Sequence, residues 1–197
     1  SVKTLHTILR FNVKCLQTQN QVNILYVNDN VHDKSQALAK AFKNSDRVVY
    51  VEYSASVDND SLEKLIGQYP PGYNGVILPA VTEGVDWDMF KKKIRDGSTE
   101  PSDQMGLGFD TDVDKPIKNT DFWSIKKTNP KVWSLDSKQV IKNLRERKGD
   151  GFKVPLNHND IFTKIKTCAY TKARVTLTYT HECLGNILES SGVSRTA

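Results

Sequence analysis

Three short stretches carry polar side chains at places where a ligand could bind a sheet. Asn28 and Asp29 follow the apolar run 22–27, and Glu52 lies near the end of the apolar run 47–53. In an open parallel sheet, ligands bind beyond the carboxyl ends of the strands, where an acid often holds a ribose hydroxyl and glycine lets the backbone approach. The pattern predicts a nucleotide-type or S-adenosylmethionine-type site at Asn28, Asp29, Glu52, Thr82, Glu83, Gly84 and Asp86.

A purely structural role explains the same residues. Thr82 or Asp86 can cap the next helix, and Glu83 can complement its dipole. The chain also lacks both G-x-G-x-x-G and G-x-x-x-x-G-K-[ST], so a dinucleotide or triphosphate cradle is not expected. No cofactor is predicted, and the sequence leaves open whether the chain is an enzyme.

The second candidate site is a basic segment, residues 122–175, with 13 Lys and Arg against four Asp and Glu. Cationic side chains neutralise phosphates, and exposed aromatic rings stack on unpaired bases. This composition predicts binding of RNA or single-stranded DNA. The residues expected to make the contacts are Lys126, Lys127, Lys131, Trp133, Arg145, Arg147, Lys148, Lys164, Lys166, Lys172 and Arg174.

The alternative is that the tryptophans of this segment are core residues and the lysines only a solvated face. Whether Lys164, Lys166, Lys172 and Arg174 share a face with the others is not determined by the sequence. No metal site is predicted. The acids of 108–115 lack the glycine and flanking helices of an EF-hand, and His181 with Cys183 supplies too few ligands for zinc.

Apolar runs and amphipathic stretches alternate through the first half of the chain. A helix is expected over 2–17, strands over 22–27, 47–53 and 75–81, and helices over 33–44, 60–66 and 86–94. Strands that alternate with helices, and that are apolar throughout, are typical of a parallel sheet with helices on both faces. The fold class predicted is α/β, a Rossmann-like three-layer sandwich with a mostly parallel sheet and a mixed second half.

The whole chain of 197 residues is interpreted as one α/β domain in three parts. Residues 1–95 form the N-terminal helix and the βαβαβα core, and 96–121 a long acidic loop. Residues 122–197 form a basic extension, with a strand over 131–135, a helix over 137–148, and either strands or a strand-helix-strand set at 152–156, 161–167 and 173–179.

Residues 23–87 resemble the second RecA-like lobe of superfamily 2 helicases, because a strand-helix alternation ends in Thr82-Glu83-Gly84-Val85-Asp86. Such lobes continue to a Gln-x-x-Gly-Arg-x-x-Arg motif, whereas 104-QMGLGFD-110 has no arginine, so the resemblance implies an ATP-inert lobe. The sheet is also similar to that of a methyltransferase, with Glu52 as the ribose acid, but the glycine-rich first loop is missing. Each resemblance covers about a third of the chain.

The leading functional hypothesis is a non-catalytic nucleic-acid-binding module of a larger replication or nucleic-acid-processing protein, with a viral origin as one interpretation. The rivals are a divergent nucleotide-type enzyme domain and a protein-interaction scaffold that uses the N-terminal helix and the 96–121 loop. Other domains or subunits are the further partners expected. The absence of a long apolar run predicts no membrane insertion, and three scattered cysteines suggest a reducing, cytoplasmic or nuclear location.

Overall fold

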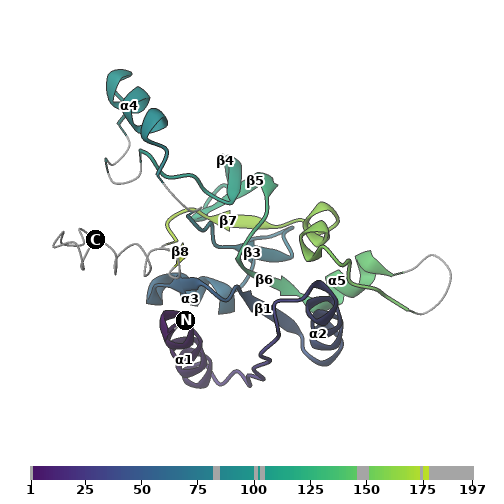
Figure 1. Ribbon diagram of the computed structural model, residues 1–197. Helices are drawn as coiled ribbons and strands as arrows, with labels where there is room; N and C mark the ends of the chain where they lie inside the picture. The colour runs from purple at the N-terminus through teal and green to yellow at the C-terminus, as the bar shows by residue number, and fades with distance from the viewer. Residues whose placement is uncertain are drawn as a thin grey trace.

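The computed structural model describes residues 2–81, 85–99, 102, 105–145, 151–173 and 175–177. It is an α/β structure built on a six-stranded mixed sheet (Figure 1). The helices are α1 (Val2–Gln17), α2 (Val31–Asn44), α3 (Asn59–Ile66), α4 (Trp87–Arg95), α5 (Ser137–Leu144) and the 3-10 helix η1 (His158–Thr163). The strands are β1 (Arg47–Val51), β2 (Ala55–Val57), β3 (Gly75–Ile77), β4 (Thr111–Pro116), β5 (Phe122–Thr128), β6 (Val132–Asp136), β7 (Cys168–Tyr170) and β8 (Val175–Leu177).

The prediction of a mostly parallel sheet is wrong. The strand order is β1-β6-β3-β7-β5-β4, and only β3 and β7 run parallel, while β2 and β8 form a separate antiparallel pair. Strands β1 and β3 do point the same way, but β6 from the second half of the chain lies between them, antiparallel to both. An apolar strand that is buried on both faces can pair with a parallel or an antiparallel neighbour, so the sequence pattern does not determine which strand lies beside it.

Both faces of the sheet are nevertheless covered, as the apolar strands predicted. On one face, α1 and α3 pack with the small β2-β8 sheet over a core that includes Leu62, Leu65, Val76, Leu78 and Val132. On the other, α2, α5 and η1 pack over a second core. Its central members are Phe42, Ile77, Trp133, Leu135 and Ile161. The arrangement is therefore layered without having the Rossmann strand order.

Helices are the elements that the sequence located best, because their ends carry local signals. Asn30 accepts hydrogen bonds from the backbone N–H groups of His32 and Asp33, so α2 begins at Val31 and not at the expected cap, Asp33. Asp58 and Asp136 cap α3 and α5 through their carboxylates. Side-chain oxygens at these positions satisfy N–H groups that the helix itself leaves without partners.

The strand expected over 22–27 is not formed: the segment is extended but belongs to neither sheet. Its apolar side chains are largely exposed, Tyr26 by 74 %. The segment passes from α1, on one face of the sheet, to α2, on the other, and so must run around the edge formed by β1 (Figure 1).

Three further expectations need correction. Residues 111–116 form β4 and pair with β5, so 96–121 is not one continuous loop. In the second half, 158–163 is the helix η1, the strand β7 begins only at Cys168, and only Phe152 of 152–156 makes a β-bridge. Helix α5 ends at Leu144, four residues before the expected end.

Candidate functional site

The carboxyl end of β1 carries a hydrogen-bonded group of charged side chains. The Tyr50 hydroxyl lies 2.6 Å from Oε2 of Glu52, and Nζ of Lys34 lies 3.3 Å from Oε1 of the same carboxylate. The Lys34 ammonium also contacts Asp29, at 2.6 Å. Lys34 and Glu52 are mostly buried, whereas Asp29 is exposed. We call Asp29, Lys34, Tyr50 and Glu52 the β1-end cluster.

Burial and the neighbouring carboxylates set the protonation states of this cluster. Burial, the hydrogen bond to Glu52 and its negative charge raise the pKa of Tyr50 far above its usual value. Burial on its own lowers the pKa of Lys34, but the hydrogen bond to Asp29 and the charge of Glu52 outweigh it and raise the pKa. Tyr50 and Lys34 therefore both stay protonated at neutral pH and act as donors, not as general bases.

His158, from η1, lies against this cluster. Its ring is 5.0 Å from that of Tyr50, centroid to centroid, at an interplanar angle of 45°. Burial lowers the pKa of His158, although the charge of Glu52 opposes this effect. A neutral imidazole at neutral pH can donate and accept a proton, but the described residues contain no group of three His, Cys, Asp or Glu that could hold a metal ion.

The predicted strand-end site is assembled only in part. Asp29 and Glu52 come together, but through Lys34, and Asn28 lies exposed beside them. Asp86 caps α4 at the N–H groups of Asp88 and Met89, as the structural alternative proposed. Thr82, Glu83 and Gly84 lie outside the described residues. Because β6 separates β1 from β3, the crevice of converging loops that motivated this site is absent from the sheet as described.

Asp110, one of the acids of 108–115 weighed above as a calcium loop, is a half-buried carboxylate with a structural role. It accepts hydrogen bonds from the backbone N–H groups of Ala80 and Lys131, both at 3.1 Å, and from the Thr111 hydroxyl at 2.9 Å. The Lys131 carbonyl in turn accepts from the N–H of Glu52 at 2.9 Å. Burial raises the pKa of Asp110, although the hydrogen bonds that it accepts oppose this effect. The same hydrogen bonds tie the segment that follows β3 to the start of β4 and to the residue before β6.

Trp133 was expected to stack on bases and does not reach solvent. Its exposed fraction is 0 %, and its ring stacks between those of Tyr50 and Phe42. The ring centroids are 5.2 Å apart for Tyr50 and 6.4 Å apart for Phe42. Phe162 meets it edge-on at 5.7 Å. Trp133 is therefore a core residue, as the alternative interpretation held, and its nucleic-acid role is withdrawn.

The predicted basic residues do not form one patch. The Lys172 ammonium lies 2.8 Å from Asp121, which also has Lys64 at 4.0 Å, and the Lys166 ammonium lies 4.6 Å from the Tyr73 ring centre. Of the remaining predicted residues, Lys126 and Lys127 are exposed on β5, and Lys131 precedes β6. Lys164 follows η1, and Arg145 follows α5. Arg147, Lys148 and Arg174 lie outside the described residues.

The structure brings Arg145 together with cations from the first half of the chain. Helices α2 and α5 pack in the same layer, and Phe152 lies between them, with a β-bridge to Arg145 and the Lys43 ammonium 5.6 Å from its ring centre. The Ser35 hydroxyl donates to the Val154 carbonyl at 2.8 Å and fixes this segment on α2. We call the exposed cations of these segments the α2-α5 face: Lys40, Lys43, Lys142, Arg145 and Lys153.

The sequence does not reveal this face because Lys40 and Lys43 lie about a hundred residues before Arg145. The periodicity of α2 places both lysines off its apolar stripe, but it does not show which helix packs beside them. None of the five cations has an ion-pair partner among the residues that the structure describes.

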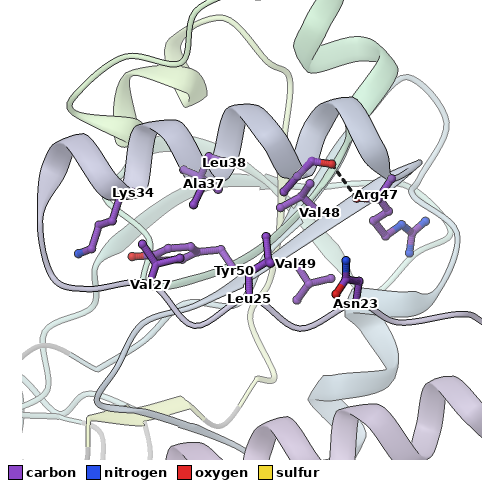
Figure 2. A pocket seen from close by; sticks show the side chains of 12 residues that line it. Asn23, Leu25, Val27, Lys34, Ala37, Leu38, Arg47, Val48, Val49 and Tyr50 are labelled. Carbon is purple, nitrogen blue, oxygen red and sulfur yellow. Dashed lines mark hydrogen bonds between the residues drawn. The ribbon is translucent and has the colours of Figure 1, made fainter.

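A separate groove lies at the open edge of β1, between α2 and residues 23–27 (Figure 2). Its volume is about 140 Å³, and most of its lining is apolar. Pockets for small-molecule ligands usually enclose roughly 300–1,000 Å³, so this groove is too small for an ordinary cofactor.

Comparisons with known proteins identify no family. No protein-family model matches the chain, and no curated protein or solved structure is significantly similar to it. Among the described residues, none of the helices combines the length and the apolar character needed to cross a bilayer.

Proposed function

We propose that the chain is a non-catalytic nucleic-acid-binding module that contacts RNA or single-stranded DNA through the α2-α5 face. The observation that supports this is the gathering of five exposed cations, none with an ion-pair partner in the part of the chain that the structure describes, from three contacting segments of one layer. Phosphates are the ligands that such a face neutralises, with release of bound counterions.

The burial of Trp133 changes the expected mode of binding. With no exposed aromatic ring from the predicted set on this face, base stacking contributes little, and contacts to the phosphate backbone dominate. Binding should then depend weakly on base sequence and strongly on salt. For five neutralised phosphates on a single strand, a slope of about 0.7 per phosphate predicts that affinity falls roughly 100-fold between 50 and 200 mM salt.

Fluorescence anisotropy with a labelled single-stranded oligonucleotide tests the proposal. Lys142→Glu with Arg145→Glu should weaken binding at least tenfold and reduce the salt slope. Lys115→Glu with Lys118→Glu makes the same change of charge on exposed residues in and after β4, and should have a much smaller effect. Equal losses of affinity in the two double variants would show that binding depends only on net charge. Binding that is absent, or that does not depend on salt, would exclude the proposed function.

The proposal keeps the wider expectation of a larger replication or nucleic-acid-processing protein in a reducing compartment. Cys15 and Cys168 are buried free thiols, and burial raises the pKa of Cys168 to about 12. Such thiols are unreactive. Their state is compatible with a cytoplasmic or nuclear location but does not require one.

The outer face of α1 favours a second candidate function, a protein-interaction scaffold. Most apolar side chains of this helix face solvent, whereas Thr4, Thr7 and Cys15 are buried and Ile8 is half-buried. The exposed apolar residues, which we call the α1 stripe, are Val2, Leu5, Leu9, Val13 and Leu16. Their average spacing is close to the 3.5 residues of a coiled-coil seam, so the partner that fits is another helix.

Substitution on this stripe separates the two functions. Leu9→Glu with Leu16→Glu should leave the free energy of unfolding and oligonucleotide binding unchanged, and should abolish association with a helical partner. A large loss of stability in this variant would show that the stripe is already covered within the chain and would remove the scaffold function.

A further inference from the structure

The outer edge of β1 has free backbone hydrogen-bonding groups. The N–H of Glu52 donates to the Lys131 carbonyl, and the N–H of Ser137 donates to the Asp46 carbonyl. Alternate residues of an antiparallel strand face the same neighbour, so the even-numbered residues 46–52 face β6. Arg47, Val49 and Val51 therefore direct their N–H and C=O groups outward, and within the described chain none of these groups has a backbone partner.

Residues 22–27 lie beside this edge without closing it. Figure 2 shows Asn23 near Arg47, Leu25 near Val49 and Val27 near Tyr50, so the segment runs in the same direction as β1. The contact of Lys34 with Glu52 supports this direction, because it places the start of α2, which follows the segment, at the carboxyl end of β1. Asn23, Leu25 and Val27 line the groove and Ile24 and Tyr26 do not, although all four apolar side chains of the segment remain exposed, Leu25 by 45 % and Ile24 by 37 %.

Alternate side chains of the segment thus line the groove, and within the described chain the segment makes no backbone hydrogen bond to β1. Displacing it breaks no backbone hydrogen bond to the sheet, whereas an incoming strand can satisfy the outward groups of three residues. An unprotected edge of this kind is a template for pairing with another chain. The side chains that already sit there show what fits: an extended chain with apolar or small polar residues at alternate positions.

We propose that the edge of β1 is a docking site for an extended peptide strand of a protein partner, which replaces residues 22–27 and adds to the sheet parallel to β1. Leu38, Val48 and the apolar part of Tyr50 form the wall that receives its alternate side chains. This interaction is separate from the α2-α5 face, because the groove lies on the flank of α2 that carries Lys34, Ala37 and Ala41, and not Lys40 or Lys43.

A labelled peptide with the sequence of residues 21–29, QVNILYVND, is the probe. We expect saturable binding to the full chain, measured by anisotropy, and slower amide hydrogen exchange at Val49 and Val51 in the presence of the peptide. A scrambled peptide of the same composition should bind at least tenfold more weakly. Leu25→Asp with Val27→Asp in the protein should strengthen binding, because the chain's own segment leaves the groove.

Val49→Pro is the matched disruption, since it removes one outward N–H on an edge strand, where proline is tolerated. It should weaken peptide binding at least tenfold while oligonucleotide binding stays unchanged. The exchange measurement on the unaltered chain keeps the proposal testable if this variant does not fold.

Three outcomes would overturn the proposal. The first is no binding of the peptide by either the unaltered chain or the Leu25→Asp, Val27→Asp variant. The second is strong exchange protection of Val49 and Val51 in the free monomer, which would assign the edge to the chain's own segment. The third is the same protection in a concentration-dependent dimer that Val49→Pro abolishes, which would assign the edge to a second copy.

Discussion

The Tyr50 hydroxyl donates a 2.6 Å hydrogen bond to the carboxylate of Glu52, two residues further along the chain, which is held from the other side by Lys34. Side chains two residues apart on a strand share a face, so this contact follows from the strand geometry of β1. Among the described residues of the predicted strand-end site, Asp29 and Glu52 come together, and this contact joins them to the aromatic stack around Trp133.

Neutralising Glu52 should destabilise the fold. Glu52→Gln leaves the mostly buried Lys34 with a single, exposed carboxylate and weakens the bond from Tyr50, so we expect a loss of about 2 kcal/mol in the free energy of unfolding. A double-mutant cycle with Tyr50→Phe should give a coupling energy of about 1 kcal/mol in urea unfolding. Asp46→Asn removes one charge of an exposed pair with Lys138 and serves as the control. Additive effects of the two substitutions would contradict a direct Tyr50-Glu52 bond.

The stability should fall as the pH drops below about 6.5, the ordinary pKa of histidine. Burial lowers the pKa of His158 in the folded state, so the unfolded chain binds more protons at pH values between the folded and unfolded pKa values, whereas below both values the two states bind the same number. Stability therefore rises with pH across this window. Urea unfolding between pH 7.5 and 5.5 should show the dependence, and His158→Gln should flatten it. An unchanged slope in the variant would place the responsible group elsewhere.

Trp133 should be among the most sensitive positions of the chain. Trp133→Ala removes a fully buried ring that touches both α2 and η1, and we expect a loss of about 4 kcal/mol in the free energy of unfolding. Trp133→Phe should cost less, partly because the indole N–H has no hydrogen-bond partner in the described structure. Trp87→Ala on the exposed side of α4 should change stability by less than about 0.5 kcal/mol. Equal effects at the two tryptophans would contradict the burial of Trp133.

Gly75 should not tolerate a side chain. A Cβ at this position would lie 2.7 Å from the Ser134 carbonyl oxygen and would also overlap the Leu135 side chain, so β3 and β6 would have to separate. Gly75→Ala should cost about 2 kcal/mol, as overpacking of a core does. Gly151→Ala is the matched control, because nothing lies within 4 Å of its added Cβ. Thermal unfolding of both variants checks the difference, and a neutral Gly75→Ala would mean that the two strands are further apart.

Helices were predictable from the sequence because their signals are local. The apolar spacing of α2, α3 and α5, the cap at Asp86 and the stop after Ile66 all depend on residues within a few positions of each other. For α1 the same spacing located the helix but not its buried face. The stripe through Leu9 is exposed, and the face with Thr7 packs on β2, where its hydroxyl accepts from the Val57 N–H at 3.1 Å.

The sequence by itself determined where most helices and the apolar strands lie and that helices cover the sheet on both faces, because periodicity and capping depend on near neighbours. Only the tertiary structure decided that β6 enters between β1 and β3, that Trp133 is buried and that Lys43 lies near Arg145. These relationships join residues tens of positions apart, and a strand that is apolar on both faces accepts a neighbour of either direction. Residues 22–27, expected to form a strand of the sheet, lie beside its β1 edge without pairing with it.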